Sequence, residues 1–241
     1  MTATYSDYAK MIDHALLLPT TTVEQLEAGC RMARDYDVAS VCMLPWFVKY
    51  GTLALAGSTV LPSTVIGFPH GGQSTTVKLA EAQQAVADGC QELDMVVNIS
   101  QVLSGNWDYV QFEITGIVEI VHDADRKVKV IFENCYLEDD HKIRLCEICT
   151  EAGADWVKTS TGFGTGGATH DDLRLMVANT PDAVQVKAAG GVRDFAGLKA
   201  VREIGATRCG ASATKAILDG CREELGLEPI QSSVETTSEG Y

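Results

Sequence analysis

The sequence predicts a single-domain α/β protein with the (β/α)8 or TIM-barrel architecture, and three observations support this fold class. Eight short β-rich runs alternate with helical stretches, which is typical of parallel α/β folds. The length of 241 residues fits a barrel of roughly 250 residues. A doubly wound open sheet is the alternative, but it usually carries a glycine-rich loop after its first strand, and neither of the first two runs has one.

The elements follow from local patterns along the chain. The predicted strands, in order, are residues 11–15, 38–43, 63–68, 91–97, 127–133, 155–160, 183–189 and 206–211. Thr21 stands three residues before Glu24, which predicts a capping box at the start of the first helix. Gly89, Gly153 and Gly205 each follow a helical stretch, and glycine is common just after a helix end.

Composition limits the class of protein. The net charge of −14 argues against nucleic-acid binding, which needs a basic face. No apolar run reaches the roughly 18–20 residues of a membrane span, and the N-terminal residues lack the apolar core of a signal peptide. The eight cysteines are scattered, and Cys146 and Cys149 form one Cys-x-x-Cys without a partner pair. We therefore expect reduced thiols in a cytoplasmic protein.

Charged side chains occur within several predicted strands. Side chains of a barrel strand alternate between the interior and the helix layer. In residues 155–160, Lys158 shares a face with Trp156, and in residues 183–189, Lys187 alternates with valines. In residues 91–97, Asp94 shares a face with Glu92. Lys158, Lys187 and Asp94 should therefore point into the barrel near the carboxyl ends of the strands, which form the catalytic face of this architecture.

Two buried lysines on neighbouring strands indicate a chemistry. A buried ammonium beside another positive charge has a lowered pKa, and a neutral lysine amine can form a Schiff base with a carbonyl group. The alternative is structural: both lysines could simply pair with interior acids such as Asp13, Asp94 or Glu133.

The last two strands are followed by loops that suggest an anion site. Residues 188–194, AAGGVRD, place Gly190, Gly191 and Arg193 after the seventh strand, and residues 209–215, CGASATK, place Gly210 and Ser212 after the eighth. Barrels commonly bind phosphate with these two loops and a helix N-terminus. Ordinary turn chemistry is the alternative for either loop alone.

Five motifs resemble those of one enzyme family, the 2-deoxyribose-5-phosphate aldolases, which are class I aldolases on a (β/α)8 barrel. They are IDHALL, VIGFPHG, ELDMVVNI, VKTSTGF and VKAAGGVRD. The resemblance runs in the family's order from about Met11 to Leu218. The pairing of VKTSTGF with KAAGGVR is its most specific part.

This resemblance implies roles for individual residues. Lys158 matches the lysine that forms the imine, Lys187 the lysine that lowers its pKa, Asp94 the aspartate of the proton relay, and Asp13 a further acid. The phosphate-binding positions are matched by Gly162, Gly190, Gly191, Gly210 and Ser212, to which the sequence itself adds Arg193, and Cys42 matches a cysteine close to the substrate. The implied reaction is reversible cleavage of 2-deoxy-D-ribose 5-phosphate to acetaldehyde and D-glyceraldehyde 3-phosphate.

Three positions depart from the family's pattern. Ala15 and Leu18 stand where the family commonly has threonine and lysine, and Phe163 stands where some members have lysine. Substrate affinity or specificity could differ as a result. A direct cationic contact to phosphate is absent at Phe163, so Arg193 and backbone amides would carry more of that task.

No cofactor or metal is expected, because the five histidines form no HxH or HExxH pattern. We expect His14 and His70 to edge the pocket, and His122 and His141 to be structural. The rival functions are another Schiff-base barrel, such as a class I fructose-bisphosphate aldolase or a transaldolase, and a non-catalytic sugar-phosphate-binding barrel.

The chain is predicted to form one barrel over residues 1–228, followed by a flexible polar tail over residues 229–241. The tail ends in Tyr241, whose hydroxyl could relay a proton, and some family members resemble this with a mobile tail that enters the site. The expected partners are a small sugar phosphate and aldehydes, with neither nucleic acid nor membrane. A homodimer stays open, since the sequence does not determine the oligomeric state.

Overall fold

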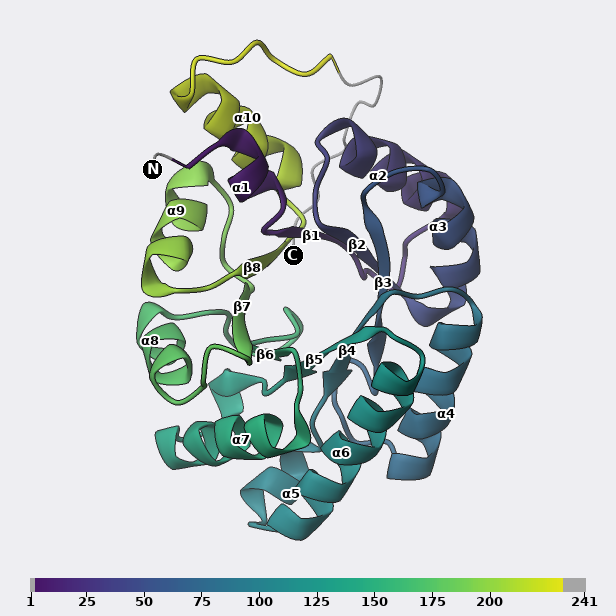
Figure 1. Cartoon of the computed structure of the whole chain (residues 1–241), viewed down its shortest axis with the longest axis vertical. Coiled ribbons are helices and arrows are strands. Elements are labelled where there is room, and N and C mark those ends of the chain that lie inside the picture. Colours follow the sequence, from purple (N-terminus) through teal and green to yellow (C-terminus); the bar gives the residue numbers. More distant parts are fainter. Residues whose placement is uncertain (1–2, 232–241) are drawn as a thin grey trace.

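The computed structural model describes residues 3–231, and its strands close into a parallel barrel (Figure 1). In chain order the strands are β1 (Ile12–Leu16), β2 (Ser40–Met43), β3 (Leu61–Ile66), β4 (Glu92–Val96), β5 (Lys127–Ile131), β6 (Trp156–Lys158), β7 (Gln185–Ala189) and β8 (Arg208–Ala211). Each strand pairs with its neighbours in sequence, and β1 pairs with β8 to close the barrel. All eight predicted strands are confirmed, with ends that differ by at most two residues.

Helices surround the strands (Figure 1). They are α1 (Tyr5–Ala9), α2 (Val23–Asp35), α3 (Val48–Leu55), α4 (Thr75–Ala87), α5 (Ile99–Leu103), α6 (Trp107–Asp123), α7 (Asp139–Ala152), α8 (His170–Ala178), α9 (Phe195–Ile204) and α10 (Thr214–Glu224), with short 3₁₀ turns η1 (Pro45–Phe47) and η2 (Asn134–Tyr136). The single-domain (β/α)8 barrel predicted from the sequence is the fold of the described residues.

Helix ends follow the predicted signals with one correction. The capping box of α2 is formed by Thr22 and Gln25, and not by Thr21 and Glu24. Three threonines are consecutive here, and only the third, Thr22, forms both hydrogen bonds of the box. Its hydroxyl accepts from the Gln25 backbone N–H, and its own backbone N–H donates to the Gln25 side-chain oxygen. The three predicted glycine stops are confirmed, because Gly89, Gly153 and Gly205 all have positive φ angles after α4, α7 and α9.

The two faces of the strands differ in polarity. Outward side chains such as Val41, Leu93 and Val130 are fully buried and belong to the apolar layer beneath the helices. Asp94 and Lys158 are also buried, yet they contact each other across the barrel interior. The alternation predicted for the charged strands is therefore confirmed, and the interior of this barrel is polar where its exterior is apolar.

The cysteines form no disulfide. All eight are free, seven of them buried and Cys135 half-buried, as expected for reduced thiols. Within residues 3–231, no helix combines the length and apolarity that crossing a membrane requires.

Only the start of the predicted tail belongs to the described part of the chain. Ile230 is half-buried and packs against the core. Tyr241 lies outside the described residues, so its proposed visit to the site stays a prediction.

Candidate active site

Lys158 lies at the carboxyl end of β6 and points into the barrel. Only 3% of the residue is exposed. Its Nζ donates to Asp94 Oδ2 of β4 over 2.7 Å. The lysine of the VKTSTGF motif is thus neither on the surface nor in the helix layer; it reaches the polar interior of the barrel.

Lys187 lies beside Lys158 in the register of β7 against β6. Its Nζ donates to the same oxygen, Asp94 Oδ2, over 2.7 Å and to Asp13 Oδ2 over 2.6 Å. Since both nitrogens are 2.7 Å from one oxygen, they lie within twice that distance of each other. The structure therefore brings Asp13, Asp94, Lys158 and Lys187 together. Glu133, the third acid that the sequence offers as a partner, bonds to Thr161 and to neither lysine.

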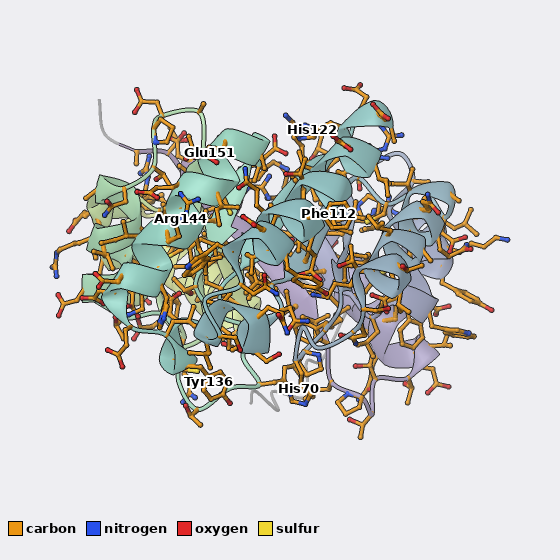
Figure 2. All side chains as sticks on the ribbon, turned by 90° about the horizontal axis from the view of Figure 1, so that it is seen from below. His70, Phe112, His122, Tyr136, Arg144 and Glu151 are labelled. Atoms are coloured by element: carbon orange, nitrogen blue, oxygen red, sulfur yellow. The ribbon has the colours of Figure 1, made fainter. Side chains whose placement is uncertain are left out.

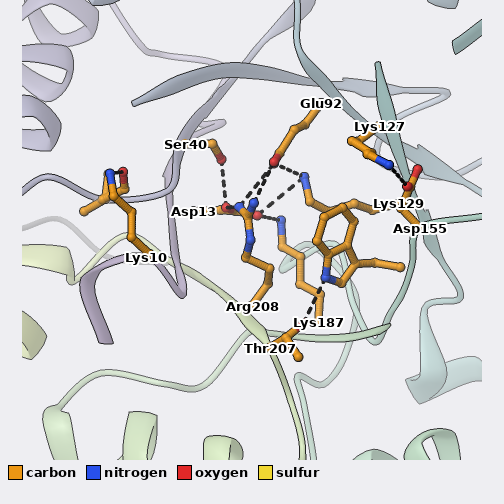
Figure 3. Close-up of polar contacts among 12 residues, drawn as sticks. Lys10, Asp13, Ser40, Glu92, Lys127, Lys129, Asp155, Lys187, Thr207 and Arg208 are labelled. Carbon is orange, nitrogen blue, oxygen red and sulfur yellow. Dashed lines mark hydrogen bonds and ion pairs between the residues drawn. The ribbon is translucent and has the colours of Figure 1, made fainter. Parts of the chain in front are cut away.

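Three further charged groups complete this cluster, and the sequence interpretation missed them as site residues (Figure 3). Lys129 of β5 donates to Glu92 over 2.7 Å and to Asp94 over 2.8 Å. Arg208 of β8 donates to Asp13 and to Glu92, over 2.6 Å each. Lys129 alternates with valines in β5, so the rule that placed Lys158 inward would have found it; Arg208 is the first residue of β8 and follows Thr207, so its signal is weaker.

We call these seven residues the barrel network: Asp13, Glu92, Asp94, Lys129, Lys158, Lys187 and Arg208. Its ion pairs join four cations to three carboxylates. Full protonation of the lysines would leave one buried positive charge in excess, which is costly in a low-dielectric interior. One lysine is therefore expected to give up its proton first.

The environment of each lysine shows which one this is. Burial lowers the pKa of Lys158, the Asp94 carboxylate opposes this, and the positive charge of Lys187 lowers it further, so the net direction is downward. For Lys187, burial acts downward too, but Asp13 and Asp94 outweigh it and the pKa is raised. Burial is thus the largest cause for Lys158, ahead of the neighbouring lysine that the sequence emphasised. Lys158 is the lysine most easily present as a neutral amine.

Lys129, Asp94 and Asp13 keep their charges. Lys129, held among three carboxylates, has a pKa well above its usual value despite burial. Burial raises the pKa of Asp94, but the neighbouring lysines outweigh it and hold this pKa well below its usual range. The pKa of Asp13 is lowered in the same way. Asp94 therefore remains a carboxylate and can accept a proton only transiently.

Above the network, at the carboxyl end of the strands, lies a cavity of about 520 Å³. Lys158, Lys187, Asp13 and Cys42 line its floor and sides. All the predicted phosphate-binding residues line the same cavity: Gly162, Gly190, Gly191, Arg193, Gly210 and Ser212. Ser212 and Gly210 lie just before α10, whose N-terminus offers unpaired N–H groups. The two loops predicted to bind an anion thus open onto the cavity that Lys158 lines.

One wall of the cavity is apolar. Leu17, Cys42 and Val65 form a small buried cluster, against which Ala15 and Phe163 pack. The Phe163 ring stands edge-on to Phe68, with 5.3 Å between ring centroids. Of the three departures from the family pattern, Ala15 lines the cavity, Phe163 packs against this apolar cluster without lining the cavity, and Leu18 is not part of the lining.

Burial raises the pKa of the Cys42 thiol to about 11. The thiol is therefore almost entirely protonated at neutral pH, although it lines the cavity.

The histidine predictions are partly wrong. His14 points outward, with Nδ1 2.9 Å from Thr214 Oγ1, and burial lowers its pKa to about 4. It follows the inward Asp13, so alternation turns it away from the cavity. His70 is exposed and does not belong to the cavity lining. Figure 2 shows His70 near Tyr136 at one edge of the barrel, while His122 lies at the opposite edge. His122 contacts Asp155, and His141 caps α7, as structural roles require.

A metal site is not apparent in the described part of the chain: residues 3–231 contain no group of three or more His, Cys, Asp or Glu side chains arranged to hold an ion.

Comparisons with known proteins agree on one family. The profile of the DeoC/LacD family aldolases matches residues 8–220. A deoxyribose-phosphate aldolase of Rhodopirellula baltica is 61% identical over 237 residues, which cover 98% of each chain. Among solved structures, a putative deoxyribose-phosphate aldolase from Coccidioides immitis is 34% identical with a TM-score of 0.88, covering 92% of this chain and 88% of that one. A deoxyribose phosphate aldolase from Aeropyrum pernix, described as having a unique tetrameric structure, is 31% identical with a TM-score of 0.84, covering 92% and 93%.

Proposed function

Because this chain belongs to the DeoC/LacD family of aldolases, we propose that it is a deoxyribose-phosphate aldolase that works through a Schiff base on Lys158. The reaction is the reversible cleavage of 2-deoxy-D-ribose 5-phosphate to acetaldehyde and D-glyceraldehyde 3-phosphate. The observation that carries the proposal is that the lysine with the lowered pKa and both glycine-rich loops line one cavity.

The covalent step begins at the Lys158 nitrogen. The neutral amine attacks C1 of the open-chain sugar, and the carbinolamine takes up a proton on its hydroxyl and loses water to give a protonated imine. When the C3 hydroxyl loses its proton and the C2–C3 bond breaks, the electron pair moves into the C1–C2 enamine, while C3 leaves as the aldehyde of glyceraldehyde 3-phosphate. Protonation of C2 and hydrolysis of the imine then release acetaldehyde and restore the amine.

The barrel network supplies the proton transfers. Asp94 and Lys187 share a hydrogen bond next to the Lys158 nitrogen, so a proton can pass between them and bound water as the carbinolamine loses its hydroxyl. Asp13 holds Lys187 from the other side over 2.6 Å. The glycine backbone amides, Ser212 and Arg193 would bind the phosphate at the opposite side of the cavity, where the sugar's C5 end would then lie.

Reductive trapping tests the proposed function. Borohydride added with acetaldehyde should leave a two-carbon secondary amine on Lys158, which peptide mass spectrometry can locate. In parallel, release of glyceraldehyde 3-phosphate from deoxyribose 5-phosphate should exceed any cleavage of fructose 1,6-bisphosphate. An adduct without cleavage of the deoxy sugar would refute the substrate, and absence of both would refute the Schiff-base aldolase altogether.

A second prediction concerns the cavity thiol. Acetaldehyde condenses with itself and loses water to give an unsaturated aldehyde, to whose β-carbon a thiolate adds. Cys42→Met should therefore keep its activity longer than wild type at high acetaldehyde, as measured by activity half-life and by the mass of the Cys42 peptide. The raised pKa makes this inactivation slow. Cys135→Ser, which changes a half-buried thiol that does not line the cavity, is the control; equal half-lives for Cys42→Met and wild type would contradict the prediction.

The assembly of the enzyme stays a prediction. The sequence leaves a homodimer open, whereas the solved relative from Aeropyrum pernix is described as a tetramer.

A further inference from the structure

Glu133 combines two features that are unfavourable in an ordinary residue. It follows β5 with φ 60° and ψ 62°, in the left-handed region that favours glycine. Glu133 is also only 2% exposed, and burial raises the pKa of its carboxyl group. A buried carboxylate on a left-handed backbone needs compensating contacts, and such residues concentrate at functional sites.

The compensating contacts all go to one loop. One carboxylate oxygen accepts from the Thr161 backbone N–H over 3.1 Å, and the other accepts from the Thr161 hydroxyl. The same hydroxyl oxygen accepts from the Phe163 N–H over 3.0 Å. The carboxylate also lies against Gly164, where an added Cβ would be 3.0 Å from Glu133 Cδ. Glu133 thus touches the loop that begins three residues after Lys158.

The other end of this loop is fixed by backbone packing. The Ala168 N–H donates to the carbonyl groups of Ala189 and Gly190, over 3.0 Å each. A Cβ on Gly167 would lie 2.5 Å from the Gly190 oxygen, so the two glycine-rich loops touch directly. Between these two fixed ends, Thr161, Gly162, Gly164, Thr165, Gly166 and Gly167 line the cavity.

We propose that Glu133 is a positioning residue that holds the Thr161–Gly167 loop where it receives the substrate's phosphate. The proposal rests on the proposed function. Glu133 is not among the residues that line the cavity, so it acts through Thr161 and not by contact with substrate. A glycine-rich loop has many accessible conformations, and its backbone amides bind an anion well only when they are held in place.

The test compares a phosphorylated with an unphosphorylated substrate. Glu133→Ala should lower the ratio of kcat/KM for deoxyribose 5-phosphate to that for 2-deoxyribose by about tenfold, mainly through KM, because misplaced binding groups lose affinity for the phosphate alone. Glu133→Gln keeps the side-chain length and an oxygen for the Thr161 N–H, so it should recover most of the ratio. Thr161→Val removes the hydroxyl bond and should lower the ratio in the same direction.

A matched control separates positioning from support of the fold. Glu113 is also fully buried, but its carboxylate pairs with Lys78 over 2.9 Å behind β4 and contacts no cavity residue. Glu113→Gln should lower thermal stability and leave the substrate ratio at the wild-type value. If Glu133→Ala does not fold, Thr161→Val carries the test, and a wild-type ratio in Thr161→Val would overturn the proposal. Equal losses on both substrates would overturn it as well.

Binding of inorganic phosphate distinguishes this proposal from the proposed function. Calorimetry should show weaker phosphate binding to Thr161→Val and Glu133→Ala than to wild type. A wild-type protein that binds phosphate but does not cleave deoxyribose 5-phosphate would refute the aldolase function and leave the role of Glu133 standing. Cleavage by wild type together with unchanged phosphate binding in both variants would refute the role of Glu133 alone.

Discussion

Replacing Lys158 by alanine should abolish imine formation and lower turnover of deoxyribose 5-phosphate by at least about a hundredfold, since covalent catalysis contributes several kcal/mol to lowering the barrier. The fold should persist. The barrel network would then hold three cations for three carboxylates, so no buried charge is left without a counterpart. We expect the free energy of unfolding to fall by no more than about 2 kcal/mol, from the lost packing of the side chain.

Steady-state rates, borohydride trapping and thermal unfolding measure these effects separately. Lys199→Ala is a suitable control, because this lysine belongs to α9, pairs with Glu224 on the surface and is not part of the network. It should retain wild-type rates and trapping. Retention of more than about a hundredth of the activity by Lys158→Ala would indicate another nucleophile.

Replacing Lys187 by leucine should move the rising limb of the pH–rate profile to higher pH by about one unit or more. Two charges roughly 5 Å apart interact by about 3 kcal/mol at an effective dielectric constant near 20, and one pKa unit corresponds to about 1.4 kcal/mol. Without Lys187, the Asp94 oxygen that both lysines share would accept only from Lys158, so it would stabilise the Lys158 charge more strongly. Both changes favour the protonated form of Lys158, raise its pKa and reduce the neutral amine at a given pH.

Lys187→Arg is the matched control, because it keeps a positive charge at the same position. It should leave the limb near its wild-type pH, even if its different shape lowers the maximal rate. The measurement is kcat/KM across pH, with circular dichroism to confirm the fold of each variant. An unmoved limb in Lys187→Leu would show that Lys187 does not tune the nucleophile and that burial alone lowers the pKa of Lys158.

Most of the fold was predictable because the alternation of polar and apolar residues along a barrel strand indicates which side chains point inward. Alternating polarity identified the inward face of β4, β6 and β7, and length with the strand–helix rhythm indicated the closed barrel. The prediction that His14 edges the pocket failed because it did not apply this rule: His14 follows an inward aspartate and therefore points away from the barrel interior. The capping residue of α2 could not be assigned from three consecutive threonines, since only the folded geometry decides which one bonds to Gln25.

The composition of the site was harder to predict, because the pairing of buried charges depends on register. Lys129 stands opposite Asp94 in β5, a fact that the two strand sequences do not contain by themselves. Arg208 reaches Asp13 only because the last strand pairs with the first. Local pattern thus predicted which side chains point inward, and the family resemblance implied that Lys158 is the lysine with the lowered pKa, while the partners of the buried charges came from the closed barrel.

The barrel network has a consequence for the order in which the newly made chain can fold. Asp13 is in the first strand, and two of its cationic partners, Lys187 and Arg208, are in the last two. While the ribosome has not yet released β7 and β8, burying Asp13 would leave Lys129, at 3.5 Å, as its remaining cation in the network. Desolvating an incompletely paired carboxylate is unfavourable. The early strands and their helices can pack during synthesis, but we expect the interior of the barrel to stay hydrated until β7 and β8 emerge and bring Lys187 and Arg208 to Asp13.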